Sequence, residues 1–445
     1  MIAPSPGAGE GDTGAIDRIE AATLLGALGH HDVALAGGRV TAADRADDRR
    51  PDRRPHQRDG PEAVLRVAGR AVLPAFVDAH VHLDKAHQLE AGHALHAESC
   101  AGPLPTDVEG VIELMGRLRS SARATDVLLA ARRTIDQLVR HGTTAARVQV
   151  EVGPAVGLDL VELQLQLAAS VAHRIELQLV AFPQGGLAAP GMPALLADAV
   201  AAGLDVVGGC PYVDPDPAAH LDIVFGVAER YQLPVDLHLD FGDNPARSLI
   251  GLVAERTRAL GMQGRVTIGH VTTLASMDTN SRARALDLLA DAGISLVVMP
   301  VTDLHLTGHG DPGFRSVAPV DLAAAAGVRV AISNNNIANP FAPFGNANLL
   351  QAAWLAGVMR RSGDPESRRL LLDAITSAPA SILGLAPHGP VEGADAHLVV
   401  LDTLDPDTAI LDAPTVLATI RAGRLVEALV GVTVRGSTAG PQHLG

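Results

Sequence analysis

The sequence predicts an α/β protein whose main part is a (β/α)8 barrel, with a small β-sandwich formed by the N- and C-terminal segments. Eight short β-like runs between residues 72 and 334 are each followed by a helical pattern, an alternation typical of parallel sheets. Further β-like runs lie at both ends of the chain. The 445 residues, of which 47% are hydrophobic, suffice for one large domain and a small one.

The N-terminal segment is expected to begin with a mobile tail and to continue as strands. Residues 1–31 start with a stretch rich in Gly, Ala and Pro, which predicts the tail. The runs 32–42 and 64–74 read as strands. Between them, residues 43–62 carry many charges and prolines, a composition that favours disorder.

The barrel is expected to span residues 74–385, and the strands on either side of it are expected to pair with each other. Its eight strands are expected at 72–78, 144–152, 174–183, 204–209, 233–240, 265–270, 294–300 and 328–334. After residue 385 the β-like runs are 395–402, 416–428 and 430–436. The sandwich is therefore expected to consist of residues 32–73 and 386–436.

Composition excludes several classes of function. The net charge is -15 and no long basic block occurs, so nucleic acid and anionic membranes are not expected as partners, whereas a small molecule is. Cys100 and Cys210 are too few for a disulfide framework. The N-terminus does not read as a secretory signal, and no apolar stretch reaches membrane-spanning length. A cytoplasmic protein is expected, and the sequence leaves a homo-oligomer open.

Residues 71–88 carry the first chemical signal. Here an apolar run delivers His80, His82 and Asp84 at alternate positions, which share one face of a strand. Two imidazoles at this spacing can bind one divalent metal from the same side. His-x-His also occurs in strands with no metal, so the context has to support this interpretation.

Lys85 is the only lysine in the chain, among 35 Lys and Arg residues. Arginine cannot replace lysine where a compact or titratable ammonium is required. Chance in an arginine-biased composition is the alternative explanation.

Other polar residues follow the expected strands, where a barrel builds its active site. These residues are Gln184, His238, Asp240, His270, Asp303, His305 and the run 333–336. Three imidazoles meeting at this rim would hold a zinc or iron ion and leave one position for water, which the metal would activate.

The chain resembles the amidohydrolase superfamily, and within it the cytosine-deaminase branch. The resemblance rests on the motifs LPAFVDAHVHLDK, AFPQGG, LHLDFGDN, GHVTT, NPFAPFGNANLLQ and VEGADAHLVVLD. It implies that His80, His82 and His238 bind the metal and that His270 lies beside the metal-bound water. It also implies that Gln184 contacts the substrate ring.

Two positions depart from the family pattern. The family has a glutamate proton shuttle where this chain has Phe241, and a metal-binding aspartate where it has Asn335. An amide cannot take a proton from water. The sequence therefore predicts relocated proton transfer, with His270 and Asp240 as catalytic residues and Lys85 assisting.

Asp84 and Asp303 are the other candidates for the relocated proton shuttle. Phe241, Asn335 and Asn336 are expected to bind substrate together with Gln184. The run 205–215 contains no lysine or glutamate that could bridge two metal ions, which favours one metal ion over two. Cys210 in this run reads as a packed thiol.

The expected function is a metal-dependent amidohydrolase resembling cytosine deaminase. It would cleave a C–N bond of a small cyclic amide, amidine or aminated heterocycle with metal-activated water. Phe241 argues against cytosine itself. The alternative is a degenerate barrel that binds a ligand without hydrolysing it. A Ser-His-Asp hydrolase is disfavoured because no Gly-x-Ser-x-Gly turn occurs.

Overall fold

The computed structural model describes residues 14–46, 62–100, 102–308, 315–361 and 363–429, and the short strand at 434–435. The chain divides into two compact units. One contains residues 76–387 and 407–413, and the other contains residues 1–75, 388–406 and 414–445.

The larger unit is a closed (β/α)8, or TIM, barrel, which confirms the predicted fold class. Its eight strands run parallel in chain order around one sheet. They are β6 (Phe76–Val81), β7 (Thr143–Glu151), β8 (Glu176–Phe182), β9 (Val206–Gly209), β10 (Val235–Leu239), β11 (Val266–His270), β12 (Ser295–Val298) and β13 (Val330–Ile332). Backbone bonds from Asn335 N to His80 O and from His82 N to Asn335 O, each 2.9 Å, join the last strand region to the first.

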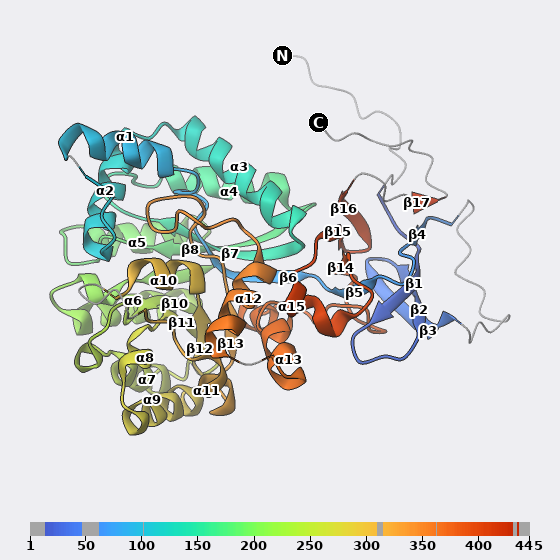
Figure 1. The fold of residues 1–445 in the computed structure, drawn as a ribbon. Helices are drawn as coiled ribbons and strands as arrows, with labels where there is room; N and C mark the ends of the chain where they lie inside the picture. The colour runs from blue at the N-terminus through green and yellow to red at the C-terminus, as the bar shows by residue number, and fades with distance from the viewer. Residues whose placement is uncertain are drawn as a thin grey trace, which may run out of the picture. The chain divides into compact units, whose positions relative to one another are not determined.

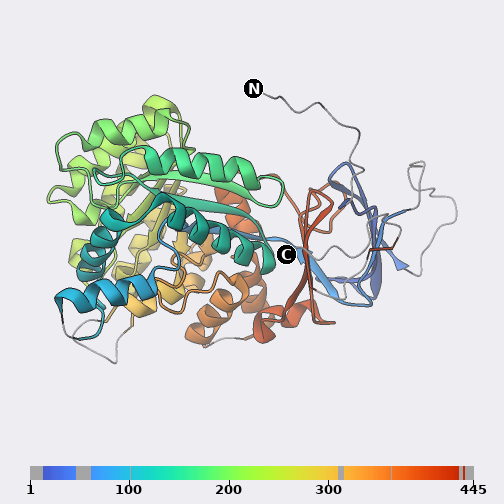
Figure 2. The same cartoon turned by 90° about the horizontal axis from the view of Figure 1, so that it is seen from above.

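Helices surround the strands of this unit, as Figures 1 and 2 show from two directions. They are α1 (Leu89–Ser99), α2 (Val108–Ser121), α3 (Ala124–Arg140), α4 (Asp159–Val171), α5 (Met192–Ala201), α6 (Pro217–Tyr231), α7 (Ile250–Ala259), α8 (Thr273–Ser276), α9 (Thr279–Asp291), α10 (Pro300–Leu306), α11 (Val320–Ala325), α12 (Leu349–Arg360), α13 (Pro365–Asp373), α14 (Ser377–Leu383) and α15 (Ala409–Asp412). Helix α3 illustrates why they form, because its buried residues Val127, Ala131, Ile135 and Leu138 recur at helical spacing on one face.

The smaller unit is a nine-stranded mixed sheet that both terminal segments build, as the sequence predicted. The N-terminal segment supplies β1 (Arg18–Leu24), β2 (His30–Ala36), β3 (Arg39–Arg45), β4 (Val64–Arg66) and β5 (Ala71–Pro74). The C-terminal segment supplies β14 (Leu398–Leu401), β15 (Val416–Arg421), β16 (Arg424–Ala428) and β17 (Val434–Arg435). Antiparallel pairing of β14 with β5 joins the two segments.

The N-terminal expectation needs a correction, because β1 lies inside the segment 1–31 that was predicted to be a mobile tail. The strand is interrupted by a register shift between Ile19 and Ala22, and Ala21 has a φ of 56°. A β-bulge of this kind breaks the alternation of buried and exposed residues by which a strand is recognised. Residues 1–13 lie outside the described part of the chain, as do 47–61 of the expected disordered loop.

A second correction concerns residues 72–78, which were expected to form one strand but belong to two. Residues up to Pro74 belong to β5 of the terminal sheet, and β6 of the barrel begins at Phe76. The apolar run is continuous because both strands are buried, so hydrophobicity alone does not mark the break.

No helix in the described ranges is both long enough and apolar enough to cross a membrane.

Candidate active site

Four histidines from three barrel strands meet in the interior of the barrel unit. His80 lies in β6, His82 follows that strand, His238 lies in β10 and His270 ends β11. The Nε2 atom of His238 is 3.1 Å from Nε2 of His80 and 3.4 Å from Nε2 of His82. Ring nitrogens of His80, His238 and His270 lie within 4.8 Å of one another. The structure therefore brings together the four imidazoles that the sequence singled out.

This spacing fits a metal ion. Two nitrogens that each bind one zinc ion at 2.0–2.1 Å with tetrahedral geometry lie about 3.3 Å apart. The two Nε2 distances from His238 agree with that value. Burial, followed by nearby positive charge, lowers the pKa of His80, His82 and His238 well below the usual value. The imidazoles are then neutral, which is the form that binds metals.

A buried polar network lies behind His80. The Nδ1 atom of His80 is 3.3 Å from Nε2 of Gln149 and 3.8 Å from a carboxylate oxygen of Asp236. Arg147, which is 1% exposed, donates to the other Asp236 oxygen at 2.8 Å. Carboxylates and amides beside a ligating imidazole orient its ring, so this network is suited to fixing His80.

His270 is held by a carboxylate. Its Nδ1 lies 2.6 Å from Oδ1 of the fully buried Asp303, which places the proton on Nδ1 and leaves a lone pair on Nε2. The Nδ2 atom of Asn335 lies 3.5 Å from that Nε2. The Asn335 side-chain oxygen accepts instead from Asn336, at 2.9 Å. His270 therefore presents a proton acceptor toward the site.

Three residues beside the site have left-handed backbone conformations. Asp240, His270 and Asn335 follow or end their strands with φ values of 49°, 71° and 62°. Such conformations are unfavourable for residues other than glycine and are found at functional sites.

Lys85 is buried in a network of alternating charges. Its ammonium is 1% exposed, donates to Gln184 and lies 3.7 Å from a Glu151 oxygen. Burial lowers the pKa of Lys85. Burial alone would raise the pKa of Glu151, but Lys85 and Arg119 together lower it. Lys85 is therefore a cation whose proton is easier to release than that of a lysine in water.

The loop that carries Gln184 is held in place by the Asp214 carboxylate. Asp214 accepts from the backbone N–H of Leu187 at 2.7 Å, and His220 Nδ1 lies 2.6 Å from the same carboxylate oxygen. Gly186 has a φ of +84°, and a Cβ atom there would lie 2.1 Å from Asp214. Glycine is therefore required for the loop to approach this carboxylate.

Two of the three acidic residues predicted as proton shuttles, Asp240 and Asp84, do not face the cavity, whereas the third, Asp303, contacts His270. Both Asp240 carboxylate oxygens are engaged, one by the hydroxyl of Ser248 and the other by the backbone N–H of Leu249 at 2.9 Å. Asp84 faces Arg119 and accepts from the backbone N–H of Glu151 at 3.1 Å. Neither aspartate lines the cavity in front of the histidines, so the catalytic role predicted for Asp240 is not supported by the geometry.

One cavity opens in front of the histidines. Its polar lining consists of His82, Lys85, Gln184, Cys210, Tyr212, His238, His270, Thr302, Asn335 and Asn336. Its apolar lining consists of Val108, Ile112, Phe182, Phe241, Leu306 and Phe341. Gln184, Phe241, Asn335 and Asn336, which the sequence predicted to bind substrate, thus all face this space.

Sequence reasoning missed several residues of the site. Arg147, Gln149 and Asp236 could have been found, because they are polar residues inside apolar strand runs. Thr302 is buried, and its hydroxyl has no hydrogen-bond partner among the described residues. Phe341 and the lining residues of α2 carry no sequence signal, since their position depends on how the helices pack.

Comparison with known proteins gives the family. The amidohydrolase family matches residues 108–427, which is more than half of the chain. N-isopropylammelide isopropyl amidohydrolase from Pseudomonas sp. (strain ADP) is 29% identical over 369 residues, covering 80% of this chain and 86% of the relative. Pterin deaminase from Rhizobium rhizogenes is 28% identical over 335 residues, covering 74% of each.

A solved structure agrees with this match. The 5-methylcytosine deaminase from Klebsiella pneumoniae, liganded with phosphonocytosine, superposes with a TM-score of 0.83 at 26% identity. The similarity covers 93% of this chain and 98% of the deaminase. The chain belongs to the metal-dependent amidohydrolase family, in its cytosine-deaminase-like branch, and is a hydrolytic enzyme that acts on carbon–nitrogen bonds.

Proposed function

We propose that this enzyme hydrolyses a C–N bond of a small nitrogen heterocycle, in the form of a cyclic amide, an amidine or an exocyclic amine. The convergence of His80, His82, His238 and His270 beneath a cavity that also contains Lys85 carries the proposal. Relatives whose names describe deamination or amide hydrolysis of ring compounds support it.

The proposed metal ligands are His80, His82 and His238, which would hold one zinc or iron ion. Their burial and the Nε2 spacing around His238 support this set. A bound ion supplies a water molecule whose pKa is low enough for attack near neutral pH. Asp236 and Gln149 would keep the His80 ring in place.

His270 is the proposed general base. Asp303 fixes its tautomer through the 2.6 Å contact, so Nε2 can accept a proton from the attacking water. The carboxylate also stabilises the imidazolium that forms. Asn335 cannot act in this way, and its amide is placed to donate to His270 or to a substrate.

Lys85 and Gln184 are proposed to bind the ring and to supply a proton. The two side chains touch each other and both line the cavity. The amide of Gln184 can pair with the edge of a heterocycle, while the Lys85 ammonium can stabilise negative charge as it develops on the ring. The carboxylate of Glu151, 3.7 Å from the ammonium, would favour the protonated form of Lys85.

Aromatic side chains fit a planar substrate. Phe182 stacks on the His238 ring, with centroids 4.1 Å apart and planes inclined by 21°. The Lys85 Nζ lies 5.5 Å from the centroid of Phe182 and 5.7 Å from that of Phe341. Flat faces of this kind favour stacking of a heterocycle over binding of an extended chain.

Metal analysis and a substrate screen test the proposal together. The purified protein is expected to contain about one zinc or iron ion per chain and to lose it in His80→Ala and His238→Ala. His93→Ala on the exposed side of α1 serves as the control and is expected to retain the metal.

The screen would measure release of ammonia or amine from cyclic ureas, imides and aminated heterocycles. Hydrolysis that requires the metal and is lost in His270→Asn supports the assignment. A protein that binds ring compounds but hydrolyses none after metal supplementation would contradict it and favour a ligand-binding barrel.

A further inference from the structure

Phe241 forms an apolar wall at the reacting end of the cavity. It lies two positions after the end of β10, and its ring stands edge-on to the His270 ring, with centroids 4.9 Å apart at 90°. His270 in turn lies within 4.8 Å of the ring nitrogens of His80 and His238. A leaving group on the His270 side of the histidine cluster would therefore lie beside Phe241.

This wall is part of a larger apolar cluster. Phe241 packs against the buried cluster formed by Val111, Met115, Leu118, Leu306 and Phe341. Leu306 and Phe341 also line the cavity, together with Ile112 of α2. The surface beside the reacting end is thus continuous with hydrophobic core, and its Phe241, Leu306 and Phe341 side chains offer no hydrogen bond to a leaving amine.

Carboxylates are missing from this end of the cavity. Within the described ranges, no aspartate or glutamate is among the lining residues. The two nearby aspartates are occupied, Asp303 by His270 and Asp240 by Ser248 and Leu249. Ammonia gains nothing from contact with this apolar wall, whereas an amine that carries an alkyl group would bury that group against it.

We propose that the leaving group is an alkylamine and that Phe241 is the residue that selects it. The inference rests on the proposed hydrolysis of an aminated heterocycle. The exocyclic C–N bond breaks and a C–O bond forms at the same ring carbon. One proton of water passes to the departing nitrogen, which leaves as a neutral primary amine. The other proton ends on a ring nitrogen, and the ring is left with a carbonyl group.

The size of the preference follows from the buried alkyl surface. Each buried methylene favours binding by about fourfold, so an isopropyl group can contribute roughly 50-fold if it is fully buried. Partial exposure of Phe241 reduces this, and a preference of at least about tenfold over the unsubstituted amine is expected.

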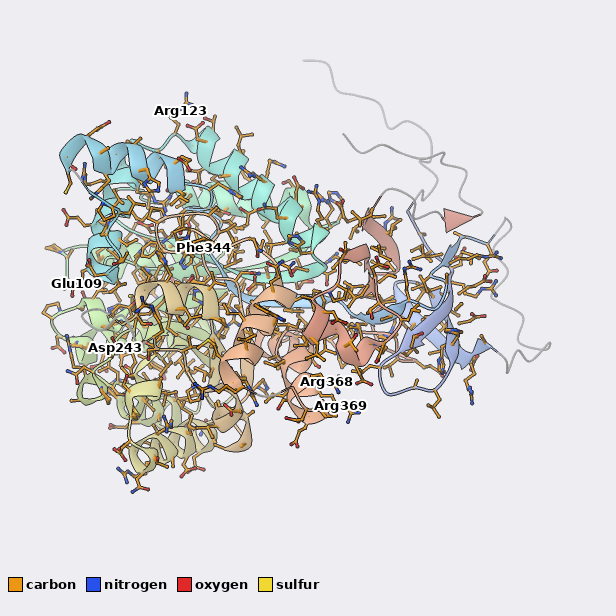
Figure 3. The ribbon with its side chains drawn as sticks, in the orientation of Figure 1. Glu109, Arg123, Asp243, Phe344, Arg368 and Arg369 are labelled. Carbon is orange, nitrogen blue, oxygen red and sulfur yellow. The ribbon has the colours of Figure 1, made fainter. Side chains whose placement is uncertain are left out.

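Matched substrate pairs test the inference. Each pair consists of an aminated ring and its N-isopropyl derivative, on triazine, pyrimidine and pteridine rings. The ratio of kcat/KM for the alkylated over the unsubstituted amine is measured for the metal-loaded native protein, for Phe241→Ala and for Phe344→Ala. Phe344 is 81% exposed, does not line the cavity and is labelled in Figure 3, so it is the matched control.

The native protein and Phe344→Ala are expected to prefer the alkylated amine by at least about tenfold, and Phe241→Ala by less than about threefold. A native preference for the unsubstituted amine, or a preference that survives in Phe241→Ala, overturns the inference.

Calorimetric affinities for the same pairs separate this inference from the proposed function. If no pair is hydrolysed, the proposed hydrolysis fails, and the affinity ratio in the native protein and in Phe241→Ala then decides the role of Phe241 by itself. Absence of binding by every pair overturns both.

Discussion

Replacing Asp303 with asparagine tests how water is deprotonated without the usual strand-end carboxylate. Asp303 has two acceptors, of which Oδ1 is 2.6 Å from His270 Nδ1 and Oδ2 accepts from the backbone N–H of Met299 at 3.2 Å. Asparagine has one acceptor. If that oxygen accepts from Met299, the amide NH2 faces His270 and donates to Nδ1. The imidazole proton then moves to Nε2, where it blocks the base.

The expected loss combines two effects. A hydrogen bond to a charged group is worth about 1.5–3 kcal/mol, which corresponds to roughly 10- to 150-fold in rate if it is realised in the transition state. The wrong tautomer adds to this, because only a fraction of the molecules keeps a free Nε2 lone pair. Asp303→Asn is therefore expected to lower kcat at least about 100-fold while KM changes less than about threefold.

Steady-state kinetics on the best heterocycle of the screen, with metal content measured on the same samples, checks this. Asp222→Asn is the control, because Asp222 forms an exposed ion pair with Arg256 at 2.8 Å, away from the site. The reasoning is refuted if Asp303→Asn keeps more than about a tenth of native kcat with full metal content. It is also refuted if the loss of activity only follows loss of metal.

Three further predictions concern Lys85, Asn335 and His397. Lys85→Met is expected to lower kcat about 100-fold at unchanged metal content. Lys85→Arg is expected to be equally slow, because the guanidinium is larger than the ammonium and does not release a proton. Steady-state kinetics and metal analysis check both variants. Asn335→Asp keeps a residue that tolerates the left-handed φ of 62° and adds an anionic oxygen near the histidines. It is expected to slow metal loss to a chelator about tenfold or more, and metal loss at the native rate would show that the side chain does not approach the ion. For His397→Gln, the fall in melting temperature between pH 7 and pH 4.5 is expected to be smaller than in the native protein, whereas the control His93→Gln should match the native fall.

The sign of the His397 effect follows from its surroundings in the terminal sheet. Burial, and then Arg421 and His388, lower the pKa of His397 from 6.5 to about 4. Its Nδ1 accepts from the backbone N–H of Ala422 at 3.1 Å, a bond that protonation breaks. The unfolded chain therefore binds this proton more readily. The stabilisation is complete above pH 6.5 and is lost as the pH falls toward 4, amounting to about 2–3 kcal/mol for this half-buried group.

The barrel strands and the histidines at their ends could be predicted from the sequence alone. Alternation of apolar runs with helical patterns determines the parallel barrel, because each strand must be buried on both faces and each helix on one. The same rule places residues that follow the strands at one rim, which is why His80, His82, His238, His270 and Gln184 were found. The resemblance of the sequence motifs identified the family.

Only the tertiary structure decided which polar groups face the cavity. Asp240 shares a strand face with His238 in sequence, but its left-handed backbone turns the carboxylate to Ser248 and Leu249. Asp303 was one of several candidates until its 2.6 Å contact with His270 singled it out. Periodicity specifies the face of a regular strand, whereas the turn beyond the strand and the neighbour across the barrel depend on contacts between residues far apart in the chain.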